Sequence, residues 1–244
     1  MAGRHALVAA SLLGVAAGIA TVTVKDTGSR SIVKDVDGNV THSLIICNAY
    51  ANPKALEVYS LTKQMKLTVE PLAYKGCREM SLDLEEGERL DFKAGGLSVG
   101  TFHCTGLPRT SAKLLLVPHR HSISALAASF ASHAYSDSPG SAQLAVVDAY
   151  SGSAAGGVQI HQGRKRSKGG EEVLKPGTVV ALTSGEYQVE LADGEDKALI
   201  TVPVTVGAET KHVALRVGVE GSYSQELVVF PNAKAAIIHS GSTR

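Results

Sequence analysis

Apolar and polar residues follow one another in short runs along most of this 244-residue chain, a pattern typical of β-strands. The runs are rich in Val, Ile, Leu and Thr, and they end at Gly, Pro, Asn or Asp. Some runs alternate, which predicts one wet face, and others are continuously apolar, which predicts strands covered on both faces. Helical periodicity is confined to the N-terminal segment and, at most, residues 124–133. The pattern predicts an all-β protein.

The same succession of runs occurs twice. The first copy, from Ser43, reads SLIICNAYANPKALEVYS, and the second, from Ala142, reads AQLAVVDAYSGSAAGGVQIHQG. Each copy runs apolar, reaches a polar residue followed by Ala-Tyr, crosses a loop of small residues and resumes as a strand. The two copies therefore indicate a duplicated unit.

The match continues beyond these stretches. Residues 84–96 match residues 182–194 around a glycine turn, and KLLLVPH from Lys113 matches ELVVFPN from Glu226. Short strands bounded by turn residues are typical of small antiparallel β-sandwiches. The sequence thus predicts two tandem antiparallel β-sandwich domains, at 27–138 (with a linker) and 139–232, followed by a tail at 233–244.

An uncharged N-terminal segment precedes the first copy. Arg4 and His5 come before ALVAASLLGVAAGIATVTV, and no charged residue occurs from Ala6 to Val24. Residues 1–24 are therefore predicted to be a hydrophobic helix, either a secretory signal peptide or a membrane anchor. Both interpretations place the rest of the chain outside the cytosol, as a secreted, periplasmic, luminal or surface protein, with membrane contact only through this segment.

Three cysteines are compatible with an oxidising compartment. Cys47 ends an apolar run and is interpreted as a small buried residue. Cys77 and Cys104 lie beside turn signals, so the disulfide is predicted between these two, with three unpaired thiols as the alternative. Asn39 begins a glycosylation sequon, which has meaning in a eukaryotic secretory route.

The charge balance excludes one large class of function. The chain has 24 Lys and Arg against 23 Asp and Glu, whereas a nucleic-acid-binding protein usually carries a basic excess. Hydrophobic residues make up 44% of the chain and charged residues 19%, which is enough apolar surface for a core. No nucleic-acid partner is expected.

Both copies resemble the DUF4397 family of extracytoplasmic domains. IICNAYANPKALEVY and VVDAYSGSAAGGVQI resemble its first strands, LTSGEYQVEL its turn-and-strand element, and VALRVGVEGSYSQELVVF its late strands. The histidine of the family motif is replaced by Asn48 and Asp148. The resemblance implies secreted or surface-exposed β-sandwiches, often in tandem, without established catalytic residues, so no active site is transferred.

A second resemblance is to the periplasmic accessory proteins of alginate O-acetylation. These proteins also have a signal peptide followed by two small β domains, each opening with a strand that ends near Asn-Ala or Asn-Leu. The similarity lies in the layout and a few residues, and it implies assistance to acetyl transfer without catalytic machinery in the chain itself.

Two sets of residues are candidates for a binding surface. Tyr50 and Tyr150 follow the repeated strand and could offer a matching pair of aromatic contacts, unless they simply cover the sandwich edge. A basic segment between glycines could bind a phosphate, a sulfate or an acidic polysaccharide, unless it is a solvated hairpin tip. Its cations are Arg164, Lys165, Arg166 and Lys168.

The motifs that suggest catalysis or metal binding lack part of what such sites require. GLSVG places Ser98 in a G-x-S-x-G pattern, but a nucleophile elbow needs a helix after the serine, and TFHCTG predicts a strand. His119 and His121 form an H-x-H pair for which no third ligand has a diagnostic spacing. We therefore expect no metal and no cofactor.

The sequence predicts a non-enzymatic extracytoplasmic binding or structural protein, an accessory subunit at a cell surface or in a lumen. Its expected partner is a protein or a surface polymer. Two alternatives stay open. One is an accessory factor in exopolysaccharide modification that binds an anionic glycan, and the other is a serine esterase that uses Ser98.

Overall fold

The computed structural model describes residues 19–23, 40, 42–82, 84–136, 140–163, 172–231 and 237–238. Every regular element in this part of the chain is a β-strand, and the strands form four sheets. The predicted all-β class, with two sandwich-like units, is confirmed.

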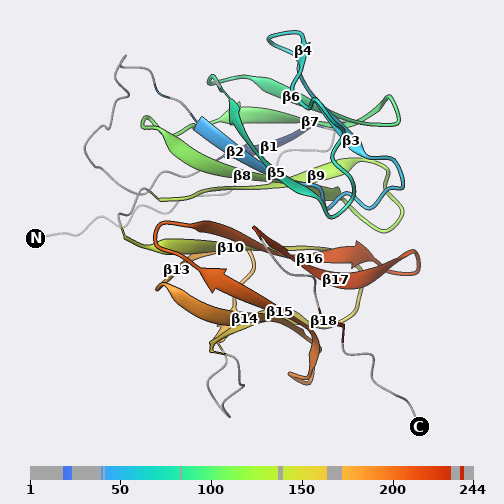
Figure 1. Cartoon of the computed structure of the whole chain (residues 1–244). Coiled ribbons are helices and arrows are strands. Elements are labelled where there is room, and N and C mark those ends of the chain that lie inside the picture. The colour runs from blue at the N-terminus through green and yellow to red at the C-terminus, as the bar shows by residue number, and fades with distance from the viewer. Residues whose placement is uncertain are drawn as a thin grey trace, which may run out of the picture.

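The first sandwich consists of an outer and an inner sheet (Figure 1). The first outer sheet has the order β1-β7-β6-β3-β4, and the first inner sheet has the order β5-β2-β8-β9. The outer strands are β1 (Ile19–Thr23), β3 (Leu56–Ser60), β4 (Met65–Lys66), β6 (Arg89–Ala94) and β7 (Leu97–Thr105). The inner strands are β2 (His42–Cys47), β5 (Cys77–Leu82), β8 (Ala112–Arg120) and β9 (Ala128–Ala134).

The second sandwich repeats this arrangement. The second inner sheet has the order β13-β10-β16-β17, and the second outer sheet has the order β12-β11-β14-β15-β18. The inner strands are β10 (Ala142–Ser151), β13 (Thr178–Leu182), β16 (Lys211–Val219) and β17 (Tyr223–Phe230). The outer strands are β11 (Gly157–Gln162), β12 (Glu172–Leu174), β14 (Gly185–Ala192), β15 (Ala198–Val206) and β18 (Ile237–Ile238).

Strand pairing differs from the expected antiparallel pattern at the centre of each inner sheet. β2 pairs in parallel with β8, and β10 pairs in parallel with β16, so both inner sheets are mixed. The equivalent of β8 is therefore β16, and the match of KLLLVPH with the β17 segment ELVVFPN is wrong. The buried polar residues His212 and Arg216 interrupt the apolar pattern of β16 and hide the true match.

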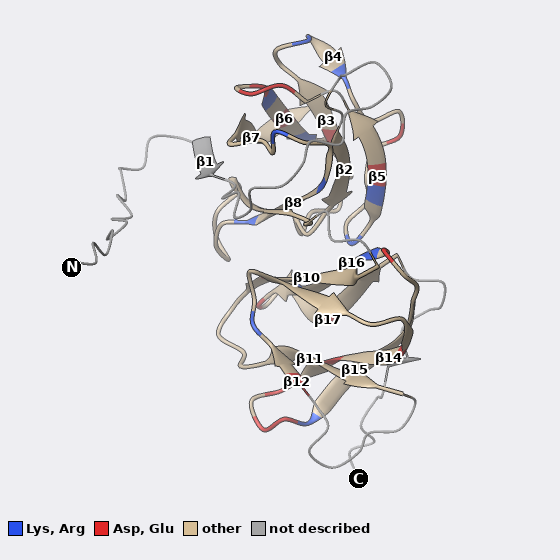
Figure 2. Ribbon diagram, turned by 90° about the vertical axis from the view of Figure 1, so that its left-hand side faces the viewer, with Lys and Arg blue, Asp and Glu red and all other residues tan. Residues whose placement is uncertain are grey.

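The four sheets stack face to face, as Figure 2 shows when the molecule is viewed along the strands. Each sandwich has a core between its outer and inner sheets. A third apolar layer, which we call the shared layer, fills the space between the two inner sheets. Its buried members are Ile45, Cys47, Ala49, Leu115, Val117, Tyr135, Ala145, Val147, Ala149, Val213, Leu215 and Val217.

The shared layer explains the continuously apolar runs in the sequence. Inner strands such as β2 and β10 are covered on both faces, so each contains an uninterrupted apolar run, at 44–47 and 144–147. Polar contacts close its margins: the Lys75 Nζ lies 2.9 Å from a Glu226 carboxylate oxygen, and the Tyr135 hydroxyl donates to the His212 carbonyl at 2.7 Å. The two sandwiches are thus packed as one body.

The terminal predictions are only partly covered by the structure. Residues 1–18 and 24 of the expected hydrophobic helix lie outside the described residues, and residues 19–23 form β1, parallel to β7. In the expected tail, residues 237–238 form β18, which pairs with β15. Residues 128–134 form a strand, not a helix. The described part of the chain contains no helix with the length and apolar character needed to cross a membrane.

The structure corrects the predicted disulfide. The bond joins Cys47 and Cys77, whose Cα atoms are 4.1 Å apart, and Cys104 is a buried free thiol. Cys47 and Cys77 lie directly opposite each other on β2 and β5, on the face that meets the shared layer. Cys104 lies in the opposite sheet and points into the first core. The Cys77–Cys104 prediction is wrong because nearby turn signals do not show which strands become neighbours.

Loss of this disulfide should destabilise the protein strongly. The bond closes a loop with a sequence separation of 30, so replacing Cys47 and Cys77 by Ala is expected to cost about 3–4 kcal/mol of unfolding free energy. Urea denaturation measures the loss. Alkylation of the unfolded, unreduced protein should modify Cys104 alone by mass spectrometry, and the Cys104→Ala variant should take up no label. A label on Cys47 or Cys77 would contradict the pairing.

Candidate functional site: the loop end of the two sandwiches

The loops that follow the repeated Ala-Tyr sequences lie at the same end of the molecule. β2 and β8 are parallel, as are β10 and β16. His119, near the end of β8, lies close enough to Asp148, near the end of β10, for that carboxylate to act on its pKa. All four strands therefore finish on the side where β16 turns into β17, on the right of Figure 1. We call this the loop end; it comprises residues 48–55, 94–97, 121–127, 151–156, 193–197 and 220–222.

The first tyrosine of the repeat has a structural role. The Asn48 Oδ1 accepts the Tyr50 backbone N–H at 2.9 Å. Tyr50 is 1% exposed, and its hydroxyl donates to the carbonyl of Leu126. The Arg120 guanidinium lies 5.4 Å from the ring centre and donates to the carbonyls of Ala51 and Ala125. Tyr50 and Arg120 hold two loops together, and the Tyr50 ring offers no contact to a ligand.

The second tyrosine is less buried but closely surrounded. The Asp148 Oδ1 accepts the Tyr150 backbone N–H at 3.0 Å, which repeats the turn made by Asn48. A Cβ atom on Gly152 would lie 2.6 Å from the Tyr150 hydroxyl oxygen, and one on Gly218 would lie 3.0 Å from the ring. Both positions therefore require glycine, and most of the Tyr150 ring is covered by its own sandwich.

Arg216 fixes the loop after Tyr150. Its guanidinium lies 4.6 Å from the centre of the Tyr150 ring and donates to the Asp148 Oδ2 at 2.9 Å. Further donations go to the Gln225 Oε1 and to the carbonyls of Ala154 and Gly156. Five N–H donors are thereby bonded, which is the full capacity of an arginine. Arg216 is 5% exposed, so a buried guanidinium with complete hydrogen bonding reaches the partly exposed carboxylate of Asp148.

The two arginines occupy different positions of the repeat. Ala49 pairs with His119, and Ala149 pairs with Val217, so Arg120 corresponds to Gly218 and Arg216 to Pro118. Each sandwich thus places a guanidinium against its repeated tyrosine from a different residue of the strand. The sequence comparison missed this arrangement because no aligned arginine marks it.

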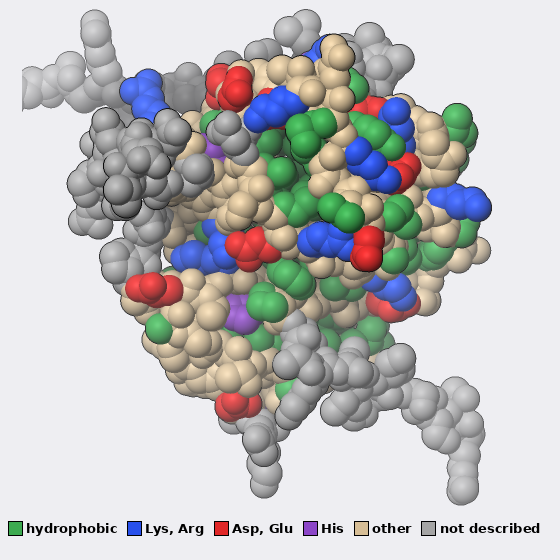
Figure 3. All heavy atoms as spheres, turned by 45° about the horizontal axis from the view of Figure 1, so that its top comes forward, with side chains coloured by type: hydrophobic (Ala, Val, Ile, Leu, Met, Phe, Trp, Pro, Cys, Tyr) green, Lys and Arg blue, Asp and Glu red, His purple; other side chains and the backbone are tan. Residues whose placement is uncertain are grey.

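The exposed surface of the loop end differs between the two sandwiches. On the first, Leu97, Ile123 and Leu126 are 75%, 51% and 71% exposed. Figure 3 looks onto the first sandwich from the top of Figure 1, with the loop end at the right, and shows hydrophobic side chains among Lys, Arg, Asp and Glu. On the second, the loops consist of small and acidic residues, with Lys197 as the one cation among residues 151–156, 193–197 and 220–222. The backbone N–H groups of Lys197 and Glu195 lower the pKa of Asp193, so that carboxylate is held in its charged form.

Several predicted sites cannot be placed at the loop end. The basic segment with Arg164, Lys165, Arg166 and Lys168 lies outside the described residues, and so does Asn39.

Ser98 does not lie on a nucleophile elbow. It is near the start of β7, which follows a hairpin turn and continues as a strand to Thr105. The Ser98 hydroxyl donates to the buried carboxylate of Asp91 at 2.5 Å. The G-x-S-x-G match is thus a glycine-rich hairpin, because the helix that an elbow requires is replaced by a strand.

The two histidines of the H-x-H pair make separate polar contacts. The His119 Nδ1 is 3.0 Å from the Arg120 carbonyl, and burial lowers the pKa of His119. The His121 Nδ1 lies 2.8 Å from the Ser129 hydroxyl. Among the residues with assigned structure, no three His, Cys, Asp or Glu side chains form a group that could hold a metal ion.

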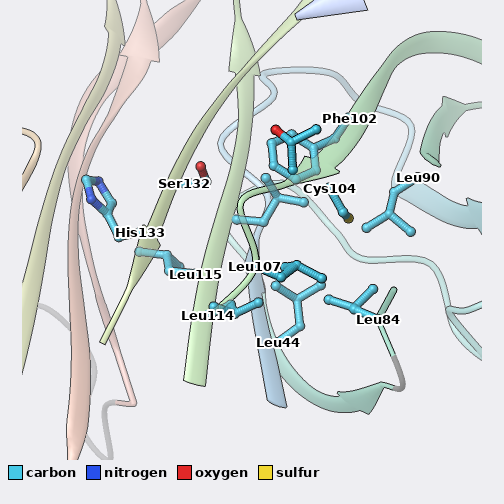
Figure 4. Close-up of a pocket in the computed structure, with 12 residues that line it drawn as sticks. Leu44, Leu84, Leu90, Phe102, Cys104, Leu107, Leu114, Leu115, Ser132 and His133 are labelled. Atoms are coloured by element: carbon cyan, nitrogen blue, oxygen red, sulfur yellow. The ribbon is translucent and has the colours of Figure 1, made fainter. Parts of the chain in front are cut away.

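A cavity of about 20 Å³ lies inside the first core, lined by Cys104, Leu44, Leu84, Leu90, Phe102 and Leu114 (Figure 4). Its size is close to that of one water molecule, and its wall is apolar. Burial raises the pKa of the Cys104 thiol to about 12, so the thiolate is not formed at neutral pH. In Figure 4, His133 points away from this cavity. The cavity is a packing defect and has no features of a substrate pocket.

The known structures that resemble this chain are distant matches. No family model and no curated protein matches the chain. Among solved structures, the chain is similar to the Bacillus anthracis TIE protein, at 9% identity and a TM-score of 0.23, over 74% of this chain and 34% of that one. It is also similar to a family CBM26 module of Eubacterium rectale Amy13K, crystallised with maltoheptaose. That match has 12% identity and a TM-score of 0.26, over 79% of this chain and 98% of the module. TM-scores this low carry no argument about function.

Proposed function

We propose that the protein is a non-enzymatic, extracytoplasmic binding protein that recognises a protein partner through its loop end, as an accessory subunit of a larger assembly. The observation that supports this proposal is the shared layer. It fixes two sandwiches in one orientation, so that the loops of both face the same side. A rigid scaffold that presents loops at one end is a common arrangement for recognition.

Two further features support the proposal. The Cys47–Cys77 disulfide suits an oxidising compartment, because cytosolic thiols are kept reduced. The exposed Leu97, Ile123 and Leu126 at the loop end are large aliphatic side chains, which become buried in protein interfaces. The loops of the second sandwich add acidic groups, which would give the interface a polar rim.

A matched pair of substitutions tests the proposal. Leu126→Asp places a charge on the loop end, and Met65→Asp places one at the opposite end, where Met65 pairs with Ser60 at the end of β3. Both side chains are more than half exposed, at 71% and 51%, so each change should alter stability by less than about 0.5 kcal/mol. The tagged full chain is crosslinked in its native source and purified at low salt.

The expected result is a partner recovered with the parent protein and with Met65→Asp, but not with Leu126→Asp. Equal recovery by all three proteins would show that the loop end is not the binding surface. Circular dichroism of each variant serves as the folding control.

A further inference from the structure

Among the described residues, two edge strands on one side of the molecule have a hydrogen-bonded neighbour on one side only. β9 is the last strand of the first inner sheet, and β13 is the last strand of the second. The Lys75–Glu226 ion pair places the β5 side of one sheet over β17 of the other, and β8 contacts β10. The two strand orders therefore bring β9 and β13 to the same margin. Ala131 and Val179 from these strands both pack against the shared layer.

The hydrogen-bond pattern shows which β9 backbone groups point outward. Ala49 N–H donates to the Pro118 carbonyl, so the backbone of Pro118 faces β2, and its β9 partner Phe130 makes no bond to β8. The Tyr135 N–H donates to the Lys113 carbonyl, so the backbone of Tyr135 faces β8. Every second residue before Tyr135 faces β8 in the same way, and the residues between them face outward. The outward groups therefore belong to Ala128, Phe130, Ser132 and Ala134, and no backbone hydrogen bond joins them to the described chain.

The same reasoning applies to β13. Val146 accepts a bond from the Gly177 N–H, and Gln143 donates to Thr210 beside β16. The backbone groups of Val146, and of every second residue before it in β10, thus point toward β13. Those of Gln143 and Ala145 point toward β16. Opposite Ala145 and Gln143 stand Val179 and Ala181, whose backbone groups point away from the sheet.

The open margin lacks the features that normally protect a sheet edge. Natural edge strands usually carry charged residues or proline, which prevent pairing with another chain. β5, on the opposite margin, contains Arg78 and Glu79, and that margin is closed by an aromatic pair with ring centres 5.3 Å apart, Tyr74 and Tyr223. β9 reads ASFASHA and β13 reads TVVAL, with no Lys, Arg, Asp, Glu or Pro.

We propose that the β9–β13 margin is an interface for a second copy of this chain, in which β9 pairs antiparallel with the β9 of that copy and β13 with its β13. Both strands run in the same direction, because each is antiparallel to one of the parallel-oriented strands β8 and β10. One two-fold axis perpendicular to the sheets therefore closes both edges at once. The pairing continues each inner sheet and the shared layer into the second copy.

Proline substitutions test this interface in the full chain. Ser132→Pro removes an N–H that points outward and breaks no bond within its own sheet, a position where an edge strand tolerates proline. Ser81→Pro is the matched control on the opposite margin. The Asn48 N–H donates to the Gly76 carbonyl, and backbone groups alternate in direction along a strand, so the Ser81 N–H points outward from β5. Light scattering during size-exclusion chromatography gives the mass of each protein from 1 to 100 µM, as about two decades of concentration cover typical dimer affinities.

The expected result is a dimer for the parent protein and for Ser81→Pro. Ser132→Pro should raise the dissociation constant of the dimer at least about tenfold. Proline removes one N–H donor from the β9–β9 pairing and distorts the hydrogen bonds beside it. Hydrogen exchange should show Phe130 and Ala134 N–H groups protected only in the dimer. A parent protein that stays monomeric, or a dimer that Ser132→Pro leaves unchanged, would overturn the proposal. Melting curves establish that the variants are folded.

Discussion

Replacing Leu215 by Ala is expected to lower the free energy of unfolding by about 2–5 kcal/mol, the range for a fully buried leucine. Leu215 is 0% exposed and lies in the shared layer, among residues of both inner sheets. The truncation leaves a cavity between the sandwiches, so both should lose stability together. Urea denaturation gives the total, and hydrogen exchange resolved by peptide shows where protection is lost.

The regions that lose hydrogen-exchange protection show whether the two sandwiches unfold together or independently. If the sandwiches are packed as one body, peptides around Ile45 and Leu115 in the first sandwich lose protection along with those of β16. Loss confined to the second sandwich would contradict the shared layer. Leu97→Ala is the control, because Leu97 is exposed and its truncation should change stability by less than about 0.5 kcal/mol.

Replacing Arg216 by Met is expected to destabilise the protein by about 2–4 kcal/mol, because it removes a buried guanidinium and leaves its hydrogen-bond acceptors without a donor. Met fills similar space, but Asp148 loses its cation and the carbonyls of Ala154 and Gly156 lose their donors. Residues 151–156 should become the least protected part of the second sandwich. Thermal melting and hydrogen exchange measure the two effects.

Two further variants sharpen this prediction. Arg120→Met removes the corresponding cation from the first sandwich, where the guanidinium makes fewer hydrogen bonds and is only half-buried, so a smaller cost of about 1–3 kcal/mol is expected. Arg216→Lys retains the charge but not the planar fork, and it should recover only part of the stability. Equal losses of unfolding free energy in Arg120→Met and Arg216→Met would show that the additional hydrogen bonds of Arg216 do not stabilise the fold.

The separation between the loop end and the open margin has a functional consequence. The loop end lies where the inner strands finish, whereas β9 and β13 run along a side of the molecule. A dimer formed at that side would leave the loops of both copies free. Because the strands pair antiparallel, the two loop ends of the dimer would point in opposite directions, and the dimer would join two partner molecules without altering the loops themselves.

The sequence by itself determined the class of fold and the duplication. Alternating and continuously apolar runs predicted strands such as those at 44–47 and 142–147, and the repeated Ala-Tyr sequence indicated two copies of one topology. These features are local, because the period of the side chains and the turn residues are both written within a few consecutive positions. The continuous runs even indicated strands covered on both faces, although nothing in the chain said that the second cover was the other sandwich.

Tertiary structure decided which strands are neighbours, and with that the chemistry of the candidate site. The Cys47–Cys77 pairing, the parallel contact of β2 with β8, and the burial of Arg216 beneath Tyr150 all join residues that are far apart in sequence. The backbone of a strand can form hydrogen bonds with any other strand edge, so the sequence of a strand does not by itself determine which strand lies beside it. The selection comes from simultaneous burial of the apolar faces in three layers, which only the folded chain achieves.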